Sequence, residues 1–214
     1  MIVSRFMTKN PLFVHPDISV TDVRAIMNKE KIGRLPVLDK HQQLIGIVTK
    51  RDLLKAGPSP ATSLDMYEIS YLLSKLKVES IMERKVITVE EHEVVEEAAR
   101  IMADEDISCL PVMKSSLLVG IITDTDLFRV FINAFGARHP GVRLTFSMTE
   151  RPGQLARLTQ AIADQGGNIV SFVSSEGDDL SRRRGTLKIT GLSRADVAAI
   201  VNTLPDTDVE DIRE

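Results

Sequence analysis

Two copies of one polar motif carry the clearest chemical signal in the sequence. Thr49 and Asp52 lie three residues apart, and Thr123 and Asp126 repeat the arrangement. Each pair stands where a strand-like apolar run gives way to a helical pattern, so the hydroxyl and the carboxylate can project to one side. An ionised carboxylate can accept hydrogen bonds from both neighbouring hydroxyls of a ribose, and each charge-assisted bond contributes about 1.5–3 kcal/mol. The motifs therefore predict two ribose-binding positions.

An ordinary helix N-cap is the competing interpretation of each pair. A threonine side chain satisfies free amides at the start of a helix, and for one copy alone this structural role is the more common one. The repetition indicates a shared architecture, but it does not separate a shared cap from a shared ligand site. Gly46 and Gly120 precede the two motifs, and without side chains they would let a flat base or a neighbouring backbone come close.

Both motifs close a tandem repeat of about fifty residues. Residues 3–53 and 78–127 share one order of apolar, proline and glycine positions, with Pro36 answering Pro111. Two copies of one small unit bury their apolar faces on each other, so the repeat predicts a paired module.

Hydrophobic periodicity predicts a β-α-β-β-α order within each repeat. In the first repeat the expected elements are a strand at 11–14, a helix with Ser19 as its N-cap, a hairpin of strands 35–38 and 44–48, and a helix from about Asp52. In the second repeat the first strand is expected at 86–88 and the last helix from Asp126.

Two breaks divide the chain further. A Pro/Gly/Ser stretch after the first repeat predicts a linker, followed by a helix with Ser63 as its N-cap. Beyond Gly136–Gly141, strands and helices follow in the ferredoxin-like order βαββαβ. The expected fold class is therefore α/β (α+β), with two β-α-β-β-α repeats and a ferredoxin-like domain. The expected boundaries are 1–56 for the first repeat, 57–77 for the linker and helix, 78–135 for the second repeat and 142–214 for the last domain.

Composition and charge exclude several classes of protein. The 214 residues include 27 Lys and Arg against 30 Asp and Glu, a net charge of −3, so no strong field attracts nucleic acid or anionic lipid. The chain starts without an apolar signal region, and no apolar run approaches bilayer length. We therefore expect a cytoplasmic protein with no membrane or nucleic-acid partner. The single cysteine, Cys109, lies in an apolar run and is predicted to be a small core residue.

No catalytic or metal-binding constellation is recognisable in the sequence. The four histidines lack ligand-type spacing with Cys109 or with one another, so we predict no metal site. The sequence contains no Walker loop, no Gly-x-Ser-x-Gly motif and no paired catalytic dyad. We therefore predict a protein that is not an enzyme, with no catalytic residues and no catalytic cofactor.

The segments IGRLPVLDKHQQLIGIVTKRDLL and ISCLPVMKSSLLVGIITDTDLF resemble the two halves of a CBS-domain pair. CBS domains, named for cystathionine β-synthase, dock in pairs with two symmetry-related clefts, which in this family bind adenosine ligands such as AMP, ADP, ATP or S-adenosylmethionine. The resemblance implies that the two Thr and Asp pairs hold the ribose. It also implies that the first strand of each repeat flanks the base, at Asn10, Pro11, Leu12, Phe13, Lys85, Val86 and Ile87.

A difference in charge between the repeats predicts two unequal clefts. Three basic residues of the first repeat, Arg34, Lys50 and Arg51, could surround a phosphate tail. Their counterparts in the second repeat are Cys109, Asp124 and Thr125. A carboxylate a few ångströms from a polyphosphate repels it by roughly 1 kcal/mol or more. We expect one cleft to take AMP, ADP or ATP and the other to be weak, empty or suited to an adenosyl ligand; which ribose pair lies beside the basic residues stays open.

The third segment, with the run TERPGQLARLTQAIADQGGNIVSF, resembles an ACT domain, a small-molecule regulatory module of amino-acid enzymes. Glu150 stands where this family usually has Asp. The resemblance implies an amino acid or carboxylate ligand near Arg151, Gly153 and Asn168, and a helix N-terminus beside Gly153 suits an anion. Equally, Pro152 and Gly153 could only build the turn, with Asn168 restarting the strand.

The order CBS, CBS, ACT resembles the acetoin-utilisation AcuB-type proteins. The combined interpretation is a non-catalytic regulatory protein that binds an adenine nucleotide or adenosyl ligand, with the ACT domain as a second small-molecule-binding or dimerisation module. Two alternatives stay open: a regulatory subunit acting in trans on a metabolic enzyme, such as one of acetoin metabolism, and a structural or assembly protein with vestigial clefts. We also expect a homodimer or higher homo-oligomer, because a lone ACT sheet exposes edges and an apolar face.

Overall fold

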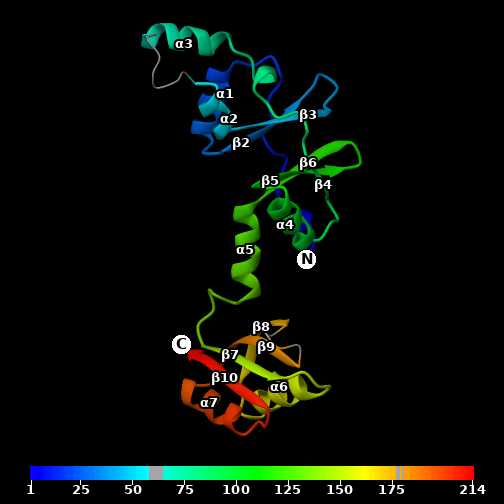
Figure 1. The fold of residues 1–214 in the computed structure, drawn as a ribbon, viewed down its shortest axis with the longest axis vertical. Coiled ribbons are helices and arrows are strands. Elements are labelled where there is room, and N and C mark those ends of the chain that lie inside the picture. The colour runs from blue at the N-terminus through cyan, green and yellow to red at the C-terminus, as the bar shows by residue number, and fades with distance from the viewer. Residues whose placement is uncertain (58–64, 177–178, 180) are drawn as a thin grey trace. The chain divides into compact units, whose positions relative to one another are not determined.

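The computed structural model describes residues 1–57, 65–176, 179 and 181–214, which divide into two compact units (Figure 1). The first unit is Met1–Leu127 and the second is Phe128–Glu214, so helix α5 (Asp124–Ala134) runs from one into the other. The other elements of the first unit are η1 (Val3–Arg5), β1 (Thr8–Lys9), α1 (Val20–Lys29), β2 (Arg34–Leu38), β3 (Leu44–Thr49), α2 (Lys50–Lys55), α3 (Met66–Lys75), η2 (Val78–Ser80), β4 (Val89–Glu90), α4 (Val95–Asp104), β5 (Cys109–Lys114) and β6 (Leu117–Thr123). Those of the second unit are β7 (Val142–Thr149), α6 (Gln154–Asp164), β8 (Asn168–Glu176), β9 (Arg182–Thr190), α7 (Arg194–Asn202) and β10 (Thr207–Arg213).

The two repeats of the first unit exchange their first segments. Strand β1 of the first repeat pairs antiparallel with β6 of the second, in a sheet of order β1-β6-β5-β4. In the other direction, the Val78 amide donates to the Ile18 carbonyl at 3.0 Å, and Glu83 bridges to Ile47 of β3 through two 2.9 Å hydrogen bonds. Each repeat thus receives part of its surface from the other.

The repeated glycines explain how this exchange is packed. A Cβ atom on Gly46 would lie 2.5 Å from the sulfur of Met82 and 3.1 Å from the carbonyl oxygen of Glu83. A Cβ on Gly120 would meet the sulfur of Met7 in the same way. In both places the methionine belongs to the other repeat, so the glycines admit the partner repeat's side chain. The structure therefore assigns them to the contact between repeats.

Several expectations about the first unit are confirmed. Ser19 caps α1, accepting a hydrogen bond from the Asp22 amide at 3.1 Å, and the apolar stripe of this helix is buried in the core. The strands β2 and β3 form the expected antiparallel hairpin. Cys109 is buried, with 8% of its surface exposed, in a small cluster with Ile47 and Ile121 that joins the repeats.

The second unit has the expected ferredoxin-like order, β7-α6-β8-β9-α7-β10, with strands arranged β10-β7-β9-β8. Burial alternates along β7, so that Leu144 and Phe146 face a core completed by α6 and α7. Ser193 caps α7, as its position before the helical pattern suggests. The C-terminal strand β10 lies at one edge of the sheet.

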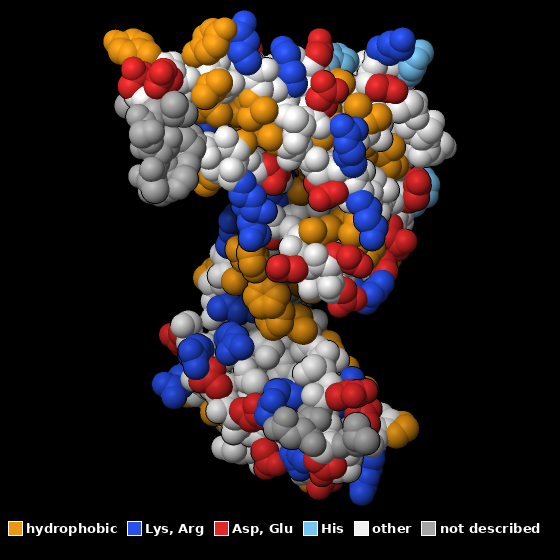
Figure 2. Space-filling view, turned by 45° about the horizontal axis from the view of Figure 1, so that its top comes forward, with side chains coloured by type: hydrophobic (Ala, Val, Ile, Leu, Met, Phe, Trp, Pro, Cys, Tyr) orange, Lys and Arg blue, Asp and Glu red, His pale blue; other side chains and the backbone are white. Residues whose placement is uncertain are grey.

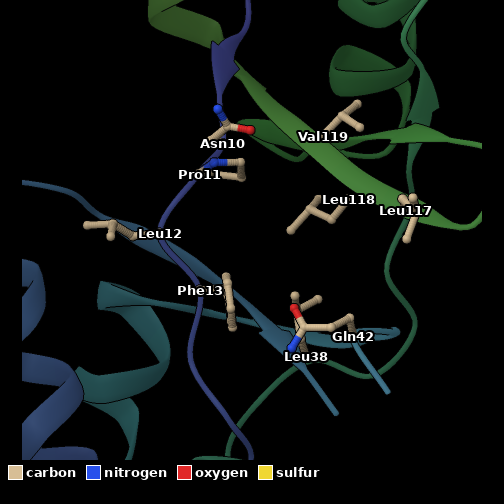
Figure 3. Close-up of a pocket in the computed structure, with 9 residues that line it drawn as sticks. All are labelled: Asn10, Pro11, Leu12, Phe13, Leu38, Gln42, Leu117, Leu118 and Val119. Carbon is tan, nitrogen blue, oxygen red and sulfur yellow. The ribbon is translucent and has the colours of Figure 1, made fainter. Parts of the chain in front are cut away.

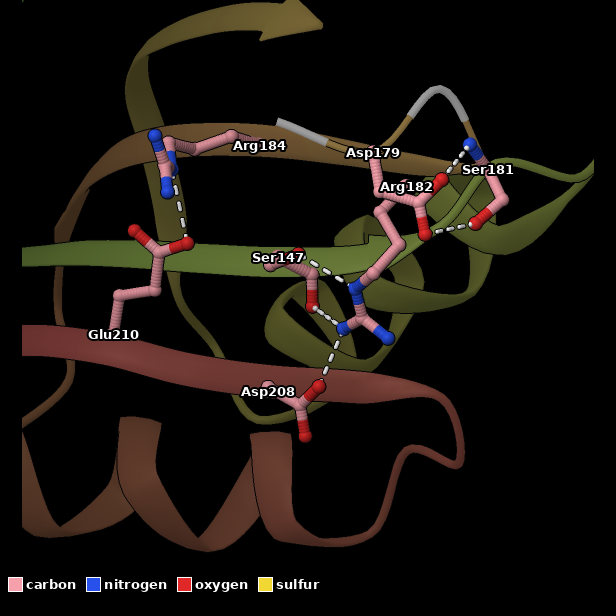
Figure 4. Close-up of polar contacts among 7 residues, drawn as sticks. All are labelled: Ser147, Asp179, Ser181, Arg182, Arg184, Asp208 and Glu210. Carbon is pink, nitrogen blue, oxygen red and sulfur yellow. Dashed lines mark hydrogen bonds and ion pairs between the residues drawn. The ribbon is translucent and has the colours of Figure 1, made fainter. Parts of the chain in front are cut away.

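The face of this sheet that points away from the helices is polar, which corrects the expectation of an apolar face. Arg182 of β9 reaches across β7, where it bonds Ser147, to an ion pair with Asp208 of β10 (Figure 4). Arg184 and Glu210 form a second ion pair between the same two strands, at 2.9 Å. Because β7 alternates strictly, apolar residues go to the helix side and polar residues remain on this face.

Two strand predictions in the repeats are wrong. Residues 11–14 make only one bridge, between Val14 and Val37, and residues 86–88 are not in a strand, which begins at Val89. These segments are extended connections that cross from one repeat to the other, so few of their backbone groups find a neighbouring strand.

Three helix starts also differ from expectation. The helices after the Thr and Asp motifs begin at Lys50 and Asp124, two residues before the predicted positions. The proposed cap Ser63 lies outside the described residues; helix α3 is capped by Asp65, whose carboxylate accepts from two amides of the first turn.

In the part of the chain that the structure describes, no helix is long and apolar enough to cross a bilayer. Among the same residues, no group of three or more His, Cys, Asp or Glu side chains is arranged to hold a metal ion. Lys, Arg, Asp and Glu side chains are interspersed over the face seen in Figure 2.

Candidate functional site

The first Thr and Asp pair forms a reciprocal helix cap. The amide and hydroxyl of Thr49 donate to Oδ2 of Asp52 at 2.8 and 2.7 Å, and the Asp52 amide donates back to the hydroxyl at 3.4 Å. This is a capping box at the start of α2. Both side chains remain partly exposed, so the cap does not remove them from solvent.

The second pair forms the same hydrogen bonds in a more enclosed setting. Thr123 donates to Oδ2 of Asp126 from its amide at 3.0 Å and from its hydroxyl at 2.7 Å. Only 5% of Asp126 is exposed, and this residue takes part in a further interaction beyond those with Thr123. Both motifs are therefore caps, and they differ in how much of the carboxylate is left for a ligand.

The first pair lines a cavity of about 580 Å³ between the repeats, here named the inter-repeat cleft. It contains residues 33–34, 47, 49–52 and 55 of the first repeat and residues 83, 85–87, 106–109 and 111 of the second. The exchange of first segments brings Lys85–Ile87 beside Thr49 and Asp52. The predicted ribose pair of one repeat and the predicted base-flanking segment of the other therefore meet in one cavity.

Positive charge gathers in the inter-repeat cleft. The three predicted phosphate-binding residues all line it, and two lysines add to them, giving Arg34, Lys50, Arg51, Lys55 and Lys85. Its carboxylates are those of Asp52, Glu83 and Asp106. The three predicted phosphate-binding residues therefore lie beside the predicted ribose pair of their own repeat, Thr49 and Asp52.

Lys55 is a cleft residue that the sequence interpretation missed. It follows Arg51 by four positions on α2, so the two side chains share one face of the helix. This four-residue spacing could have predicted that Lys55 lies beside Arg51. No local sequence pattern predicts that residues 106–109 line the cleft, because their position depends on how the second repeat packs.

Arg34 links the two repeats at the wall of the inter-repeat cleft. Its guanidinium donates a hydrogen bond to the Ser108 carbonyl of the second repeat. Burial raises the pKa of the neighbouring Cys109 thiol, and the positive charge and hydrogen bond of Arg34 oppose this rise. Since the pKa is raised overall, the thiol stays protonated at neutral pH and behaves as a core residue, as predicted.

The other base-flanking segment lines a different space, here named the hairpin cavity. Its volume is about 540 Å³, and Figure 3 shows its lining residues: Asn10, Pro11, Leu12, Phe13, Leu38, Gln42, Leu117, Leu118 and Val119. Thr123 and Asp126 are not among them. The structure therefore does not bring this segment and the second ribose pair to one described cavity.

The three residues predicted to bind an ACT ligand are exposed, but the structure does not bring them together. Arg151 and Gly153 precede α6 at the Thr149 end of the sheet, whereas Asn168 follows α6 at the opposite end, where it pairs with Thr190. Gly153 caps α6 with φ +87°, a conformation that favours glycine, and Pro152 precedes this cap and so lies outside the first turn of the helix. Asn168 is the first residue of β8. Gly153 therefore has a structural reason to be glycine, and the roles of Arg151 and Asn168 in binding remain predictions.

Comparison with known proteins identifies both parts of the chain. Residues 3–59 and 78–133, more than half of the sequence, match the family model of the CBS domain. The chain belongs to the CBS-domain family. Residues 140–213 match the TTHA0829-like ACT domain, which confirms the tandem CBS domains followed by an ACT domain.

Two curated relatives show how the CBS pair is used in different settings. The L-aspartate semialdehyde sulfurtransferase of Methanocaldococcus jannaschii is 34% identical over 131 residues, 61% of this chain but only 23% of that protein. A CBS domain-containing protein of Dictyostelium discoideum is 33% identical over 133 residues, which are 62% of this chain and 92% of the relative. The pair occurs both inside a much longer enzyme and as most of a small protein.

Similar solved structures include CBS-domain proteins in complex with adenosine compounds. The CBS domain pair of protein MJ0100, in complex with 5′-methylthioadenosine and S-adenosyl-L-methionine, is 32% identical with a TM-score of 0.52, covering 65% of this chain and 98% of that one. CBSX2 in complex with AMP is 31% identical with a TM-score of 0.50, covering 61% and 96%. AcuB from Vibrio cholerae is 30% identical with a TM-score of 0.54, covering 65% and 98%, in line with the AcuB-type resemblance.

Proposed function

We propose that this CBS-domain protein is a regulatory binding protein that takes a phosphorylated adenosine ligand in the inter-repeat cleft. One observation carries the proposal: a single cavity joins a ribose-type Thr and Asp pair to a cluster of Lys and Arg side chains. Complexes of related CBS proteins with AMP and with adenosyl compounds support the choice of adenosine.

Each part of such a ligand has matching chemistry in the cleft. Oδ2 of Asp52 carries the bonds of the cap, while no hydrogen bond among the described residues goes to Oδ1, which can accept from a ribose hydroxyl. The apolar side chains of Ile47, Val86 and Ile87 offer flat contact to a base. Five cations against three carboxylates leave a positive balance for phosphate groups.

The second repeat lacks this combination, which supports unequal clefts. The positions that match Arg34, Lys50 and Arg51 carry a buried thiol, a carboxylate and a hydroxyl. Asp126 is almost fully buried and takes part in a further interaction beyond those with Thr123. We therefore propose that a phosphorylated ligand binds only the inter-repeat cleft, and that any ligand beside Thr123 carries few phosphates.

Calorimetric titration with ATP, AMP and adenosine tests this function. Arg51→Ala should weaken ATP binding by about fivefold or more, since one charge interaction in a partly screened cleft contributes roughly 1 kcal/mol. The same change should alter adenosine affinity little. Arg157, an exposed arginine of α6 in the second unit, gives the matched control, and Arg157→Ala should leave ATP affinity unchanged. Two equivalent ATP sites that do not respond to Arg51→Ala would contradict the proposal.

The ACT domain and the regulated target complete the proposed role. We propose that ligand occupancy of the CBS pair is signalled to a metabolic enzyme acting as a separate partner, with the ACT domain as a dimerisation or second ligand-binding module. Recovery of a partner enzyme whose activity changes with ATP would support this role. A protein that binds neither nucleotide nor adenosine would favour the structural alternative.

A further inference from the structure

The hairpin cavity differs in chemistry from the inter-repeat cleft. None of its nine lining residues is charged, and its polar side chains are the amides of Asn10 and Gln42. The inter-repeat cleft, in contrast, contains eight charged residues. A phosphate or carboxylate entering the hairpin cavity would lose water without gaining a cation, so the lining favours an uncharged ligand.

The walls of the hairpin cavity are held by backbone hydrogen bonds at both ends of one segment. The Asn10 amide donates to the Val119 carbonyl at 3.1 Å, and the Val14 amide donates to the Pro36 carbonyl at 3.0 Å. Between these anchors, the amides of Leu12 and Phe13 take part in no hydrogen bond among the described residues. The segment therefore has a fixed position and backbone groups that a ligand can use.

Large apolar side chains are exposed around the same cavity. Leu12 is 52% exposed, Phe13 40% and Leu117 55%. Figure 3 shows Leu118 of β6 pointing toward the segment of residues 10–13, which carries Phe13. Exposed apolar residues that gather at a concave site with a few polar groups are typical of small-molecule pockets, and about 540 Å³ is within their usual size range.

We propose that the hairpin cavity is a second small-molecule site, separate from the inter-repeat cleft, for a neutral and largely apolar ligand. The apolar body of the ligand packs against Phe13, Leu117 and Leu118. A polar edge on the ligand hydrogen-bonds with the Asn10 or Gln42 amide groups or with the backbone between residues 11 and 13. This site does not depend on nucleotide binding.

A matched pair of fluorescent probes tests the proposal on the full chain. N-phenyl-1-naphthylamine is neutral, and 1-anilinonaphthalene-8-sulfonate has the same rings with a sulfonate added. The neutral probe should bind with the lower Kd. Phe13→Ser and Leu118→Ser should each raise that Kd by about tenfold or more. Leu54→Ser removes an apolar side chain that is 77% exposed on α2, away from this cavity, and should leave the Kd unchanged.

The outcomes separate this site from the nucleotide site. Saturating ATP should not displace the neutral probe, and probe binding should persist in the Arg51→Ala variant. Displacement of the probe by ATP, tighter binding of the sulfonate, or an equal effect of Leu54→Ser and Phe13→Ser would overturn the proposal. If the protein bound the probe but not ATP, the proposed nucleotide-binding function would be excluded, while the hairpin cavity would remain supported as a ligand site. Phe13 is exposed, so Phe13→Ser keeps the test usable if Leu118→Ser does not fold.

Discussion

At the scale of single residues, the helix cap at Asp52 is compatible with the ligand role that we propose for its carboxylate. The cap takes up Oδ2, and the side chain stays partly exposed at the inter-repeat cleft. Asp126 has the same cap but is almost fully buried. Both copies are therefore caps, and the cap leaves more of the carboxylate accessible for the proposed ligand role at Asp52 than at Asp126.

Asp52→Ala should weaken ATP and adenosine binding by about tenfold or more, because one or two charge-assisted hydrogen bonds to the ribose are lost. The same change should lower the free energy of unfolding by only about 1 kcal/mol, as loss of an N-cap does. Calorimetric titration and urea unfolding measure the two effects separately. Unchanged binding together with a large loss of stability would leave Asp52 with the structural role alone.

Asp196 provides the matched control for this experiment. Its carboxylate accepts from the amide and hydroxyl of Ser193 at 2.9 and 2.6 Å, the same box as at Asp52, but in the second unit. Asp196→Ala should cost a similar stability and leave ATP affinity unchanged. The hydrogen bond from the Ser193 hydroxyl, and then that from its amide, lowers the pKa of Asp196. This cap is therefore complete above the pKa of an unfolded aspartate and weakens as the pH falls through the lowered value, so both variants are best compared at pH 7.

At the scale of elements, the inter-repeat cleft depends on the segment exchange. Residues 83–87 reach Thr49 because Glu83 pairs with Ile47 at the edge of β3. Gly46 stands beside this pairing and accepts the Met82 side chain of the other repeat. The glycine is thus part of what positions the cleft, without touching the ligand position itself.

Gly46→Ala should destabilise the first unit by about 1–3 kcal/mol, because the added methyl group meets a methionine sulfur and a backbone carbonyl. Gly33→Ala is the comparison, since a Cβ there has no atom within 4 Å. Urea unfolding followed by circular dichroism gives both values. Equal stability of the two variants would show that Met82 moves aside freely and that the packing at Gly46 is loose.

At the scale of the whole molecule, the sheet of the second unit gives a reason for self-association. Strands β8 and β10 are its edges, and each leaves a row of backbone groups without a neighbouring strand among the described elements. The outer face of this sheet is polar and carries ion pairs, so burial of an apolar surface there is not a further reason for self-association. Edge pairing therefore becomes the physical basis for the predicted homo-oligomer.

Light scattering at micromolar concentration should show a homodimer or a higher closed oligomer, because pairing between copies satisfies the open edges. A dilution series should shift the mass toward that of one chain if the association is reversible. A single-chain mass throughout the micromolar range would exclude the prediction.

The sequence by itself determined most of the elements and their kinds. The repeat, the hairpin β2-β3, the cap Ser19 and the burial of Cys109 could all be predicted, because each depends on periodicity or residue type within a short window. Two basic residues of the inter-repeat cleft, Lys50 and Arg51, could also be predicted, since they stand between Thr49 and Asp52. Residues 11–14 and 86–88 were taken for strands because an apolar run does not reveal whether a neighbouring strand is present.

Only the tertiary structure decided which segments meet. The contact of Glu83 with Ile47 places Lys85–Ile87 in the inter-repeat cleft. Asn10–Phe13 instead lines the hairpin cavity, which does not include Thr123 and Asp126. The polar outer face of the second unit likewise follows from the register between β7, β9 and β10. These are pairings between residues far apart in the chain, and they are set by how packed surfaces fit together, which no local sequence pattern records.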